Sequence, residues 1–239
     1  MIQTCYPIIF SARSNCGLVR RQNEDVWAVQ GNLFVLADGM GGHNAGEVAA
    51  QMAVSSLVEA FGSFDQQASR EVVKNFCKKA LIEVNLKVSE AGNAHAEWKG
   101  MGSTLSALFF IDKLVAVMHV GDSRIYRLRK NTLKQLTVDH TVMNRMKGVQ
   151  EAVLFKHVLT RAIGTQREIR PQVETFPVHP QDRYLICSDG LSNYLSDEEI
   201  KQKMADTKDL EATSKDMVQL ALDRGGADNI TLILIEVGS

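Results

Sequence analysis

The chain has 239 residues, 45% of them hydrophobic and 23% charged, and its formal net charge is −1. This is the composition of an ordinary globular protein, the length allows one large domain or two small ones, and the near-neutral charge does not indicate binding to nucleic acid or to an anionic membrane. No apolar run approaches the ~18 residues of a membrane span, and residues 1–10 lack the basic and apolar segments of a secretory signal, so neither a membrane protein nor a secreted one is expected.

The predicted elements alternate between short strands and long helices. The first strand, Asn32–Ala37, leads into Asp38 and a glycine-rich turn. Two helices should follow, because two ranges carry apolar residues at helical spacing: Glu47–Phe61 and Gln66–Ala91. Short apolar or alternating runs then predict strands at Ser103–Ile111, Lys113–Val120, Arg124–Leu128, Thr132–Leu136, Tyr184–Ser188 and Ile230–Val237, with more helices between Ser196 and Arg224.

The spacing of the four central strands indicates the fold class. Very short connections join the strands between Ser103 and Leu136. We expect these strands to be antiparallel neighbours, since a parallel crossover needs a dozen residues or more. Antiparallel sheet with helices grouped outside it is typical of an α+β fold. Without a repeat or a linker-like tract, residues 1–239 should form a single domain.

The four cysteines are scattered and form no CxxC pair; they are Cys5, Cys16, Cys77 and Cys187. This spacing matches neither a zinc site nor a disulfide framework. Reduced thiols are typical of the cytosol, so we expect a cytoplasmic protein.

Acidic residues recur where predicted strands meet loops, namely Glu24, Asp25, Asp38, Asp122, Asp189 and Asp228. Any one of them could be only a turn residue, because Asp-Gly is a common turn. Strand ends of one sheet can converge, however, and so many carboxylates could not all stay ionised together without a counter-charge. No Lys/Arg cluster accompanies them, whereas hard divalent cations held by oxygen ligands would supply that charge.

Eight segments carry a resemblance to a known family, and they occur in its order: RRQNED, VLADGMGGHNAGE, GSTLSAL, VGDSRIYRL, LTVDHT, LTRAIG, ICSDGLSNYLSDEEI and ADNITLILIEV. Over nearly the whole chain the sequence resembles the type 2C, metal-dependent serine/threonine protein phosphatases (the PPM family) in their compact bacterial form. The resemblance implies a four-layer sandwich of two antiparallel β-sheets flanked by α-helices. It also implies hydrolysis of phosphoserine and phosphothreonine in proteins by a metal-activated water.

The cofactors implied by the resemblance are two tightly bound Mn²⁺ or Mg²⁺ ions, with a weaker third one. Asp38 would bridge the two ions, and the carbonyl of Gly39 would join it on one of them. Asp189 and Asp228 match the other ligands of the first ion. The glycines after Asp38 would thus let the backbone itself serve as a ligand, and we find no motif for a serine or cysteine nucleophile.

Further roles follow from the same motifs. Glu24 and Asp25 match the residues near the second ion, and which of them contacts metal stays open. Asp122 matches a residue beside the weaker third ion, although it is also a plausible turn aspartate. Arg20 matches the family's phosphate-binding arginine, since a guanidinium suits a phosphate dianion, while Arg21 is expected to be a surface charge.

His43 is a candidate general acid for the leaving alcohol. Family members with DGHGG have a histidine where this sequence has Met40, and His43 is the histidine that compact bacterial members place slightly later. The alternative is that His43 only forms a hydrogen bond near the helix start. Asn44-x-x-Glu47 and Ser196-x-x-Glu199 both fit capping boxes at helix N-termini.

The partners implied are phosphorylated proteins and a cognate bacterial serine/threonine kinase in signal transduction, with a monomer as the default state. Residues 141–158 correspond to the family's flap beside the active site. Two rival functions remain: a nucleotide-binding protein, against which Asn44 breaks the G-x-G-x-x-G pattern, and a degenerate phosphatase that only binds phosphoprotein.

Overall fold

The computed structural model describes residues 4–40, 45–62, 64, 69–145, 158–206 and 209–239. One sheet contains, in spatial order, β1 (Ile8–Asn15), β11 (Ile230–Val237), β10 (Arg183–Cys187), β7 (Arg124–Arg129) and β8 (Thr132–Gln135). The other contains β2 (Asp25–Gln30), β3 (Leu33–Met40), β5 (Leu105–Ile111), β6 (Leu114–Val120) and β9 (Gln172–Pro177), and β4 (Gly102–Ser103) pairs with β3. All pairings between these strands are antiparallel.

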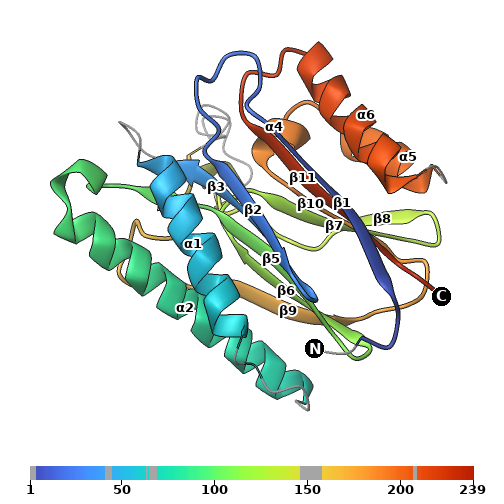
Figure 1. Ribbon diagram of the computed structural model, residues 1–239, viewed down its shortest axis with the longest axis horizontal. Coiled ribbons are helices and arrows are strands. Elements are labelled where there is room, and N and C mark those ends of the chain that lie inside the picture. The colour runs from blue at the N-terminus through green and yellow to red at the C-terminus, as the bar shows by residue number, and fades with distance from the viewer. Residues whose placement is uncertain (1–3, 41–44, 63, 65–68, 146–157, 207–208) are drawn as a thin grey trace.

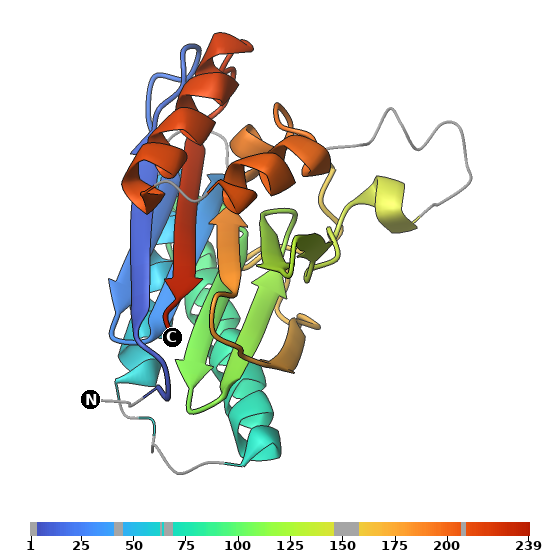
Figure 2. The ribbon, with the colours of Figure 1, turned by 90° about the vertical axis from the view of Figure 1, so that its right-hand side faces the viewer.

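The two sheets lie face to face between two pairs of helices (Figures 1 and 2). The helices α1 (Gly46–Phe61) and α2 (Arg70–Ala94) pack on the β2–β9 sheet, and α5 (Asp197–Ala205) and α6 (Leu210–Asp223) cover the other sheet. Short helical segments are η1 (Ala96–Trp98), α3 (Val142–Arg145) and α4 (Asp189–Ser192). The predicted α+β sandwich is therefore confirmed.

Side chains that alternate between the two faces of the central strands explain how the layers pack together. In β3, Leu33, Val35 and Ala37 face the α1–α2 layer, whereas Phe34 and Leu36 face the opposite sheet. The strand β11 alternates in the same way, with Leu232 and Leu234 toward α5–α6 and its other face toward the sheet interface. Because successive side chains point to opposite faces, a strand that is apolar throughout is buried on both sides.

Several predicted boundaries need correction. The helix expected at Gln66–Ala91 is described as α2, Arg70–Ala94, with Ser69 as its N-cap. The predicted strand Ser103–Ile111 is interrupted at Thr104, between β4 and β5. Three strands were not predicted: β1 (Ile8–Asn15), β2 (Asp25–Gln30) and β9 (Gln172–Pro177). The first two carry polar residues on partly exposed faces, which weakens the apolar signal.

The central four strands do not form one continuous set of neighbours. Only residues 121–123 separate β6 from β7, yet these strands belong to different sheets. The turn is tight because Gly121 has a φ of +114°, and a Cβ there would lie 2.6 Å from the side chain of Thr104. A short connection thus carries the chain across the sandwich, so β6 and β7 are not the antiparallel neighbours that the length of their connection predicted.

Of the two capping boxes, the structure confirms the one at Ser196. The Ser196 hydroxyl accepts from the backbone N–H of Glu199, and the Glu199 side chain accepts from the backbone N–H of Ser196. The box expected at Asn44 is wrong, because α1 begins at Gly46 with Ala45 as its N-cap, and no described side chain forms a capping hydrogen bond there. Asn44 itself lies outside the described residues.

Candidate active site

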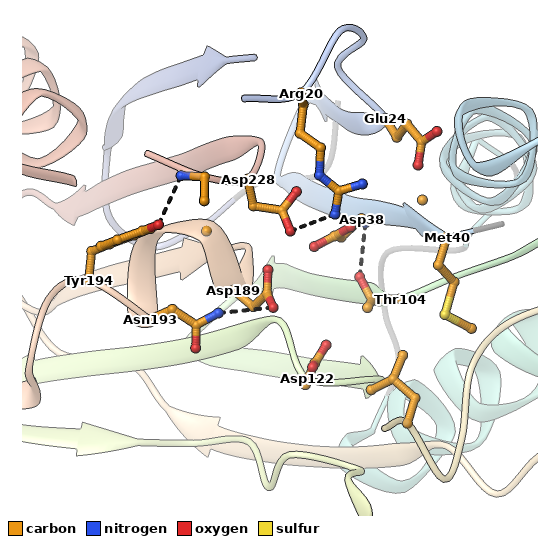
Figure 3. Close-up of a pocket in the computed structure, with 14 residues that line it drawn as sticks. Arg20, Glu24, Asp38, Met40, Thr104, Asp122, Asp189, Asn193, Tyr194 and Asp228 are labelled. Carbon is orange, nitrogen blue, oxygen red and sulfur yellow. Dashed lines mark hydrogen bonds and ion pairs between the residues drawn. The ribbon is translucent and has the colours of Figure 1, made fainter. Parts of the chain in front are cut away.

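Antiparallel pairing brings acidic residues from both sheets to one end of the sandwich. Asp38 lies near the end of β3, where β2 begins, and Asp122 follows β6. In the other sheet, Asp189 follows β10 where β11 begins. A pocket of about 890 Å³ opens there (Figure 3), and it is lined by Arg20, Glu24, Asp38, Gly39, Met40, Thr104, Asp122, Leu159, Asp189, Gly190, Asn193, Tyr194, Ala227 and Asp228.

Asp38 is fixed through its backbone by Thr104. The Asp38 N–H donates to the Thr104 hydroxyl, and the Thr104 N–H donates to the Asp38 carbonyl, both at 2.9 Å. Removal from bulk water, together with neighbouring carboxylates such as Asp25 and Asp189, raises the pKa of Asp38 well above its ordinary value. Burial and these neighbouring carboxylates therefore disfavour a charged Asp38 unless a cation balances its charge.

Asp25 lies behind the pocket rather than on its wall. It faces Asp38 directly across the β2–β3 ladder, and its carboxylate accepts from the Ser188 hydroxyl at 2.8 Å. Its other oxygen, Oδ1, is buried without a hydrogen-bond partner among the described residues. Burial raises the pKa of Asp25 to about 7.

Glu24 does line the pocket, and glycines make room for it. The Gly39 N–H donates to the Glu24 carbonyl at 3.1 Å. A Cβ on Gly39 would lie 2.2 Å from the Gly46 carbonyl oxygen, and a Cβ on Gly46 would lie 2.5 Å from Glu24 Oε2. These two glycines therefore let α1 begin directly against β3 and Glu24. Burial, and then the charge of Glu47, raise the pKa of Glu24.

Arg20 is the one cationic side chain among the described residues that line the pocket, where it faces five carboxylates. Its Nη2 donates to Asp228 Oδ2 at 2.8 Å (Figure 3). Asp122 lies across the pocket, and burial and the charge of Asp189 raise the pKa of Asp122 to about 7. Among the described lining residues, the acidic groups thus outnumber the one arginine and are not neutralised by it.

The donor set suits a hard divalent cation. All the acidic groups offer oxygen, and Gly39 adds a backbone carbonyl. Behind Asp38, Asp25 Oδ1 has no hydrogen-bond partner among the residues that the structure describes. Within the described ranges, no three acidic, histidine or cysteine side chains are close enough together to make a ready-formed metal site. The carboxylates therefore surround the pocket, and bound cations would have to draw them together.

Some sequence-predicted residues are not brought into the pocket. Arg21 is exposed and does not line it, in keeping with a surface charge. His43 lies outside the described residues, and so do residues 146–157 of the expected flap. The described ends of that flap meet, since the Val142 N–H donates to the Val158 carbonyl at 2.9 Å.

Sequence reasoning missed several polar residues at the site. Thr104 holds Asp38, Asn193 donates to Asp189 at 3.1 Å, and the Tyr194 hydroxyl accepts from the Ala227 N–H at 2.9 Å. Their positions in the sequence could have identified them as candidates, because each of them lies inside one of the recognised motifs. The bond from Asn193 to Asp189 is local, but those of Thr104 and Tyr194 join segments far apart in the chain.

The sandwich of two antiparallel sheets between helices is a fold that this chain shares with solved protein phosphatases. The crystal structure of the Mycobacterium tuberculosis serine/threonine phosphatase PstP/Ppp superposes with a TM-score of 0.88 at 32% identity, covering 97% of this chain and 99% of that one. The catalytic domain of PstP in complex with two manganese ions gives 0.87 at the same identity and coverage.

Comparison of sequences leads to the same family. The model of protein phosphatase 2C matches residues 20–230. The serine/threonine phosphatase stp of Listeria welshimeri is 33% identical over 236 residues, with 94% of each chain covered. The chain therefore belongs to the protein phosphatase 2C family, and the predicted family, fold and enzyme class are confirmed.

Proposed function

We propose that this chain hydrolyses phosphoserine and phosphothreonine in protein substrates at the acidic pocket, with two manganese or magnesium ions and a weaker third one. The observation that carries the proposal is the pocket wall itself, in which Arg20 faces the carboxylates of Glu24, Asp38, Asp122, Asp189 and Asp228. When bound, the ions would lower the pKa of an attacking water and offset the charge that develops on the phosphoryl group.

The chain's own residues would hold those ions from two sheets. Asp38 would bridge the pair, with the Gly39 carbonyl beside it, while Asp189 and Asp228 complete the first site. Glu24 lines the pocket and Asp25 does not, which favours Glu24 as the direct contact at the second site. Asp25 would then influence the second site indirectly, from behind the pocket wall, where the Ser188 hydroxyl donates to its carboxylate and orients it.

Arg20 would bind the phosphate group of the substrate. A guanidinium presents paired N–H donors that match phosphate oxygens, and Arg20 projects into the pocket (Figure 3). Asp122 would face a third cation on the opposite side. His43 stays a candidate proton donor to the leaving alcohol, since an imidazole titrates near neutral pH.

The setting of the reaction is part of the proposal. We place it in the bacterial cytoplasm as the counterpart of a serine/threonine kinase, with residues 1–239 as one catalytic domain that acts as a monomer. None of the four cysteines is in a disulfide, as in proteins of a reducing compartment. None of the helices in the described ranges combines the length and the apolar character that crossing a bilayer requires.

Release of phosphate tests the proposal. Purified protein should hydrolyse a phosphothreonine peptide and p-nitrophenyl phosphate with Mn²⁺, and EDTA should abolish turnover. The same assay separates the rival functions, because a binding-only phosphatase relative would hold the phosphopeptide without turnover. Metal-independent hydrolysis, or none with any divalent cation, would refute the mechanism. All strand pairings within the two described sheets are antiparallel, which already argues against a Rossmann-type nucleotide site.

A further inference from the structure

The loop between β1 and β2 carries two residues of the proposed site, Arg20 and Glu24, but it contains no helix or strand of its own. Its backbone lies against residues 226–229. Gly17 has a φ of +79°, and a Cβ there would lie 2.2 Å from the Asp228 carbonyl oxygen. The next residue, Leu18, donates its N–H to the Gly226 carbonyl at 2.7 Å. The loop can lie this close only because position 17 is glycine.

One side chain, that of Asn229, closes the loop at both ends. Its Nδ2 donates to the carbonyls of Cys16 and Gln22, and its Oδ1 accepts from the N–H of Glu24, each at 2.9 Å. Asn229 is only 5% exposed. Both donor hydrogens and the acceptor oxygen of the amide are therefore engaged with the loop, which uses almost all the hydrogen-bonding capacity of that side chain.

Asn229 also stands beside a proposed metal ligand. Its own N–H donates to Asp228 Oδ1 at 2.8 Å, and β11 begins at the next residue. It does not line the pocket, so it would not touch the substrate. We propose that Asn229 is a positioning residue, which holds the 16–24 loop so that Arg20 and Glu24 face the pocket beside Asp228. The kinetic part of this inference rests on the proposed function.

The chain contains a matched control for the three hydrogen bonds by which Asn229 clamps the 16–24 loop. Asn85 in α2 is fully buried, and its Nδ2 donates to the carbonyls of Gln166 and Arg167 at 2.9 and 3.1 Å. Its Oδ1 accepts from the Gly164 N–H at 2.9 Å. Asn85→Ala therefore removes the same three kinds of hydrogen bond from a loop that carries none of the proposed catalytic or binding residues.

The reactivity of the Cys16 thiol reports on the loop without any assay of catalysis. Cys16 Sγ donates to the Arg20 carbonyl at 3.3 Å and lies 3.8 Å from Asn229 Nδ2. Of the other cysteines, Cys77 and Cys187 are buried, so a Cys5→Ser background leaves Cys16 as the accessible thiol. In that background, Asn229→Ala should increase the rate of labelling by a thiol reagent about tenfold, because releasing the loop lowers the cost of local opening. Asn85→Ala should leave the rate unchanged.

Steady-state kinetics test the consequence for the site. Asn229→Ala should raise KM for p-nitrophenyl phosphate about tenfold with a smaller change in kcat, since a displaced Arg20 binds phosphate poorly. In an Arg20→Ala background the same substitution should add little to KM, because both changes remove the same interaction, that of Arg20 with phosphate. Asn85→Ala should keep the wild-type KM even if its melting temperature falls as far as that of Asn229→Ala.

A second variant covers the case in which Asn229→Ala does not fold. Asn229→Asp keeps the shape and the oxygen that accepts from Glu24, but it replaces the amide donor, so it should also speed labelling of Cys16 and raise KM. The proposal is wrong if the folded variants label no faster than Asn85→Ala, or if their KM effects add fully to that of Arg20→Ala. If the wild-type protein lacks phosphatase activity, the proposed function fails, while the labelling rates still decide whether Asn229 clamps the loop.

Discussion

The Arg20 guanidinium and the Asp228 carboxylate form an ion pair at the pocket mouth, with Nη2 2.8 Å from Oδ2 (Figure 3). Their side chains are 51% and 36% exposed, so the pair should contribute little to stability. In the proposed mechanism the two groups have different ligands, because Arg20 binds phosphate and Asp228 binds a cation. Ligand binding would therefore replace this contact rather than add to it.

Arg20→Ala should raise KM for phosphopeptides with a smaller effect on kcat, because Arg20 would bind phosphate in the ground and transition states alike. Calorimetry should show Mn²⁺ binding at least as tight as in the wild-type protein, since Asp228 loses a competing partner. Arg21→Ala is the control, and both parameters should stay at wild-type values. The opposite pattern, with an effect of Arg21 alone, would mean that the phosphate-binding role belongs to Arg21.

Asp38→Asn should abolish turnover and leave the fold intact. The substitution removes the carboxylate that would bridge two cations, and it also removes a charge that the metal-free pocket disfavours, since burial raises the pKa of Asp38. In EDTA the melting temperature should therefore equal or exceed that of the wild-type protein. Retention of more than about a tenth of the wild-type kcat, a loss under ~1.4 kcal/mol, would contradict the bridging role.

Asp122→Ala should keep two tightly bound Mn²⁺ ions by calorimetry, because Asp38, Asp189 and Asp228 would still be present. Activity should fall steeply on phosphopeptides and less on p-nitrophenyl phosphate, whose leaving group needs little protonation. The reason is that a weakly held third cation would orient a proton donor to the leaving group. Equal losses on both substrates would rule out that role, and a lower melting temperature with normal activity would favour a plain turn residue.

Two buried histidines should make the fold sensitive to acid. His119 in β6 is fully buried with Nδ1 2.9 Å from the Ser106 hydroxyl, and its ring centroid lies 4.9 Å from that of His140. Burial lowers the pKa of His119 to about 3, with His140 and Arg161 adding to the effect, and burial lowers the pKa of His140 to about 4. In the unfolded chain a histidine binds a proton near pH ~6.5.

The unfolded state thus binds more protons than the native state below that pH, and stability that is present above pH ~6.5 is lost as the pH falls toward ~4. His119→Gln should reduce this pH dependence by about 1.4 kcal/mol per pH unit. Urea unfolding of both proteins between pH 7.5 and 4.5 measures how the free energy of unfolding depends on pH in each. The carboxylates are the same in both proteins, so their contributions cancel in the difference. Parallel curves for His119→Gln and the wild-type protein would show that His119 is protonated in the native state.

The sequence was sufficient to predict most of the acidic pocket. Asp38 lies near the end of β3, and Asp122, Asp189 and Asp228 each lie two residues from the end of a strand. The apolar residues of these strands are local and continuous, so the placement of the four carboxylates at strand ends needed no knowledge of the fold. The order of the motifs then identified the family. The Ser196 capping box was readable for the same reason, since all its hydrogen bonds lie within three residues.

Only the tertiary structure decided features that depend on residues far apart in the chain. The three residues between β6 and β7 do not show that the chain moves there from one sheet to the other, because a turn of that length is equally compatible with a hairpin. The different positions of Glu24 and Asp25 likewise depend on β2, because Asp25 is the first residue of that strand and pairs with Asp38 in β3, whereas Glu24 precedes the strand. Asn229 in the sequence is only the neighbour of an acidic residue, and its three bonds to the 16–24 loop cross more than 200 residues. Local sequence thus determined which groups reach the end of the sandwich, whereas long-range packing decided which of them line the pocket and which hold the others in place.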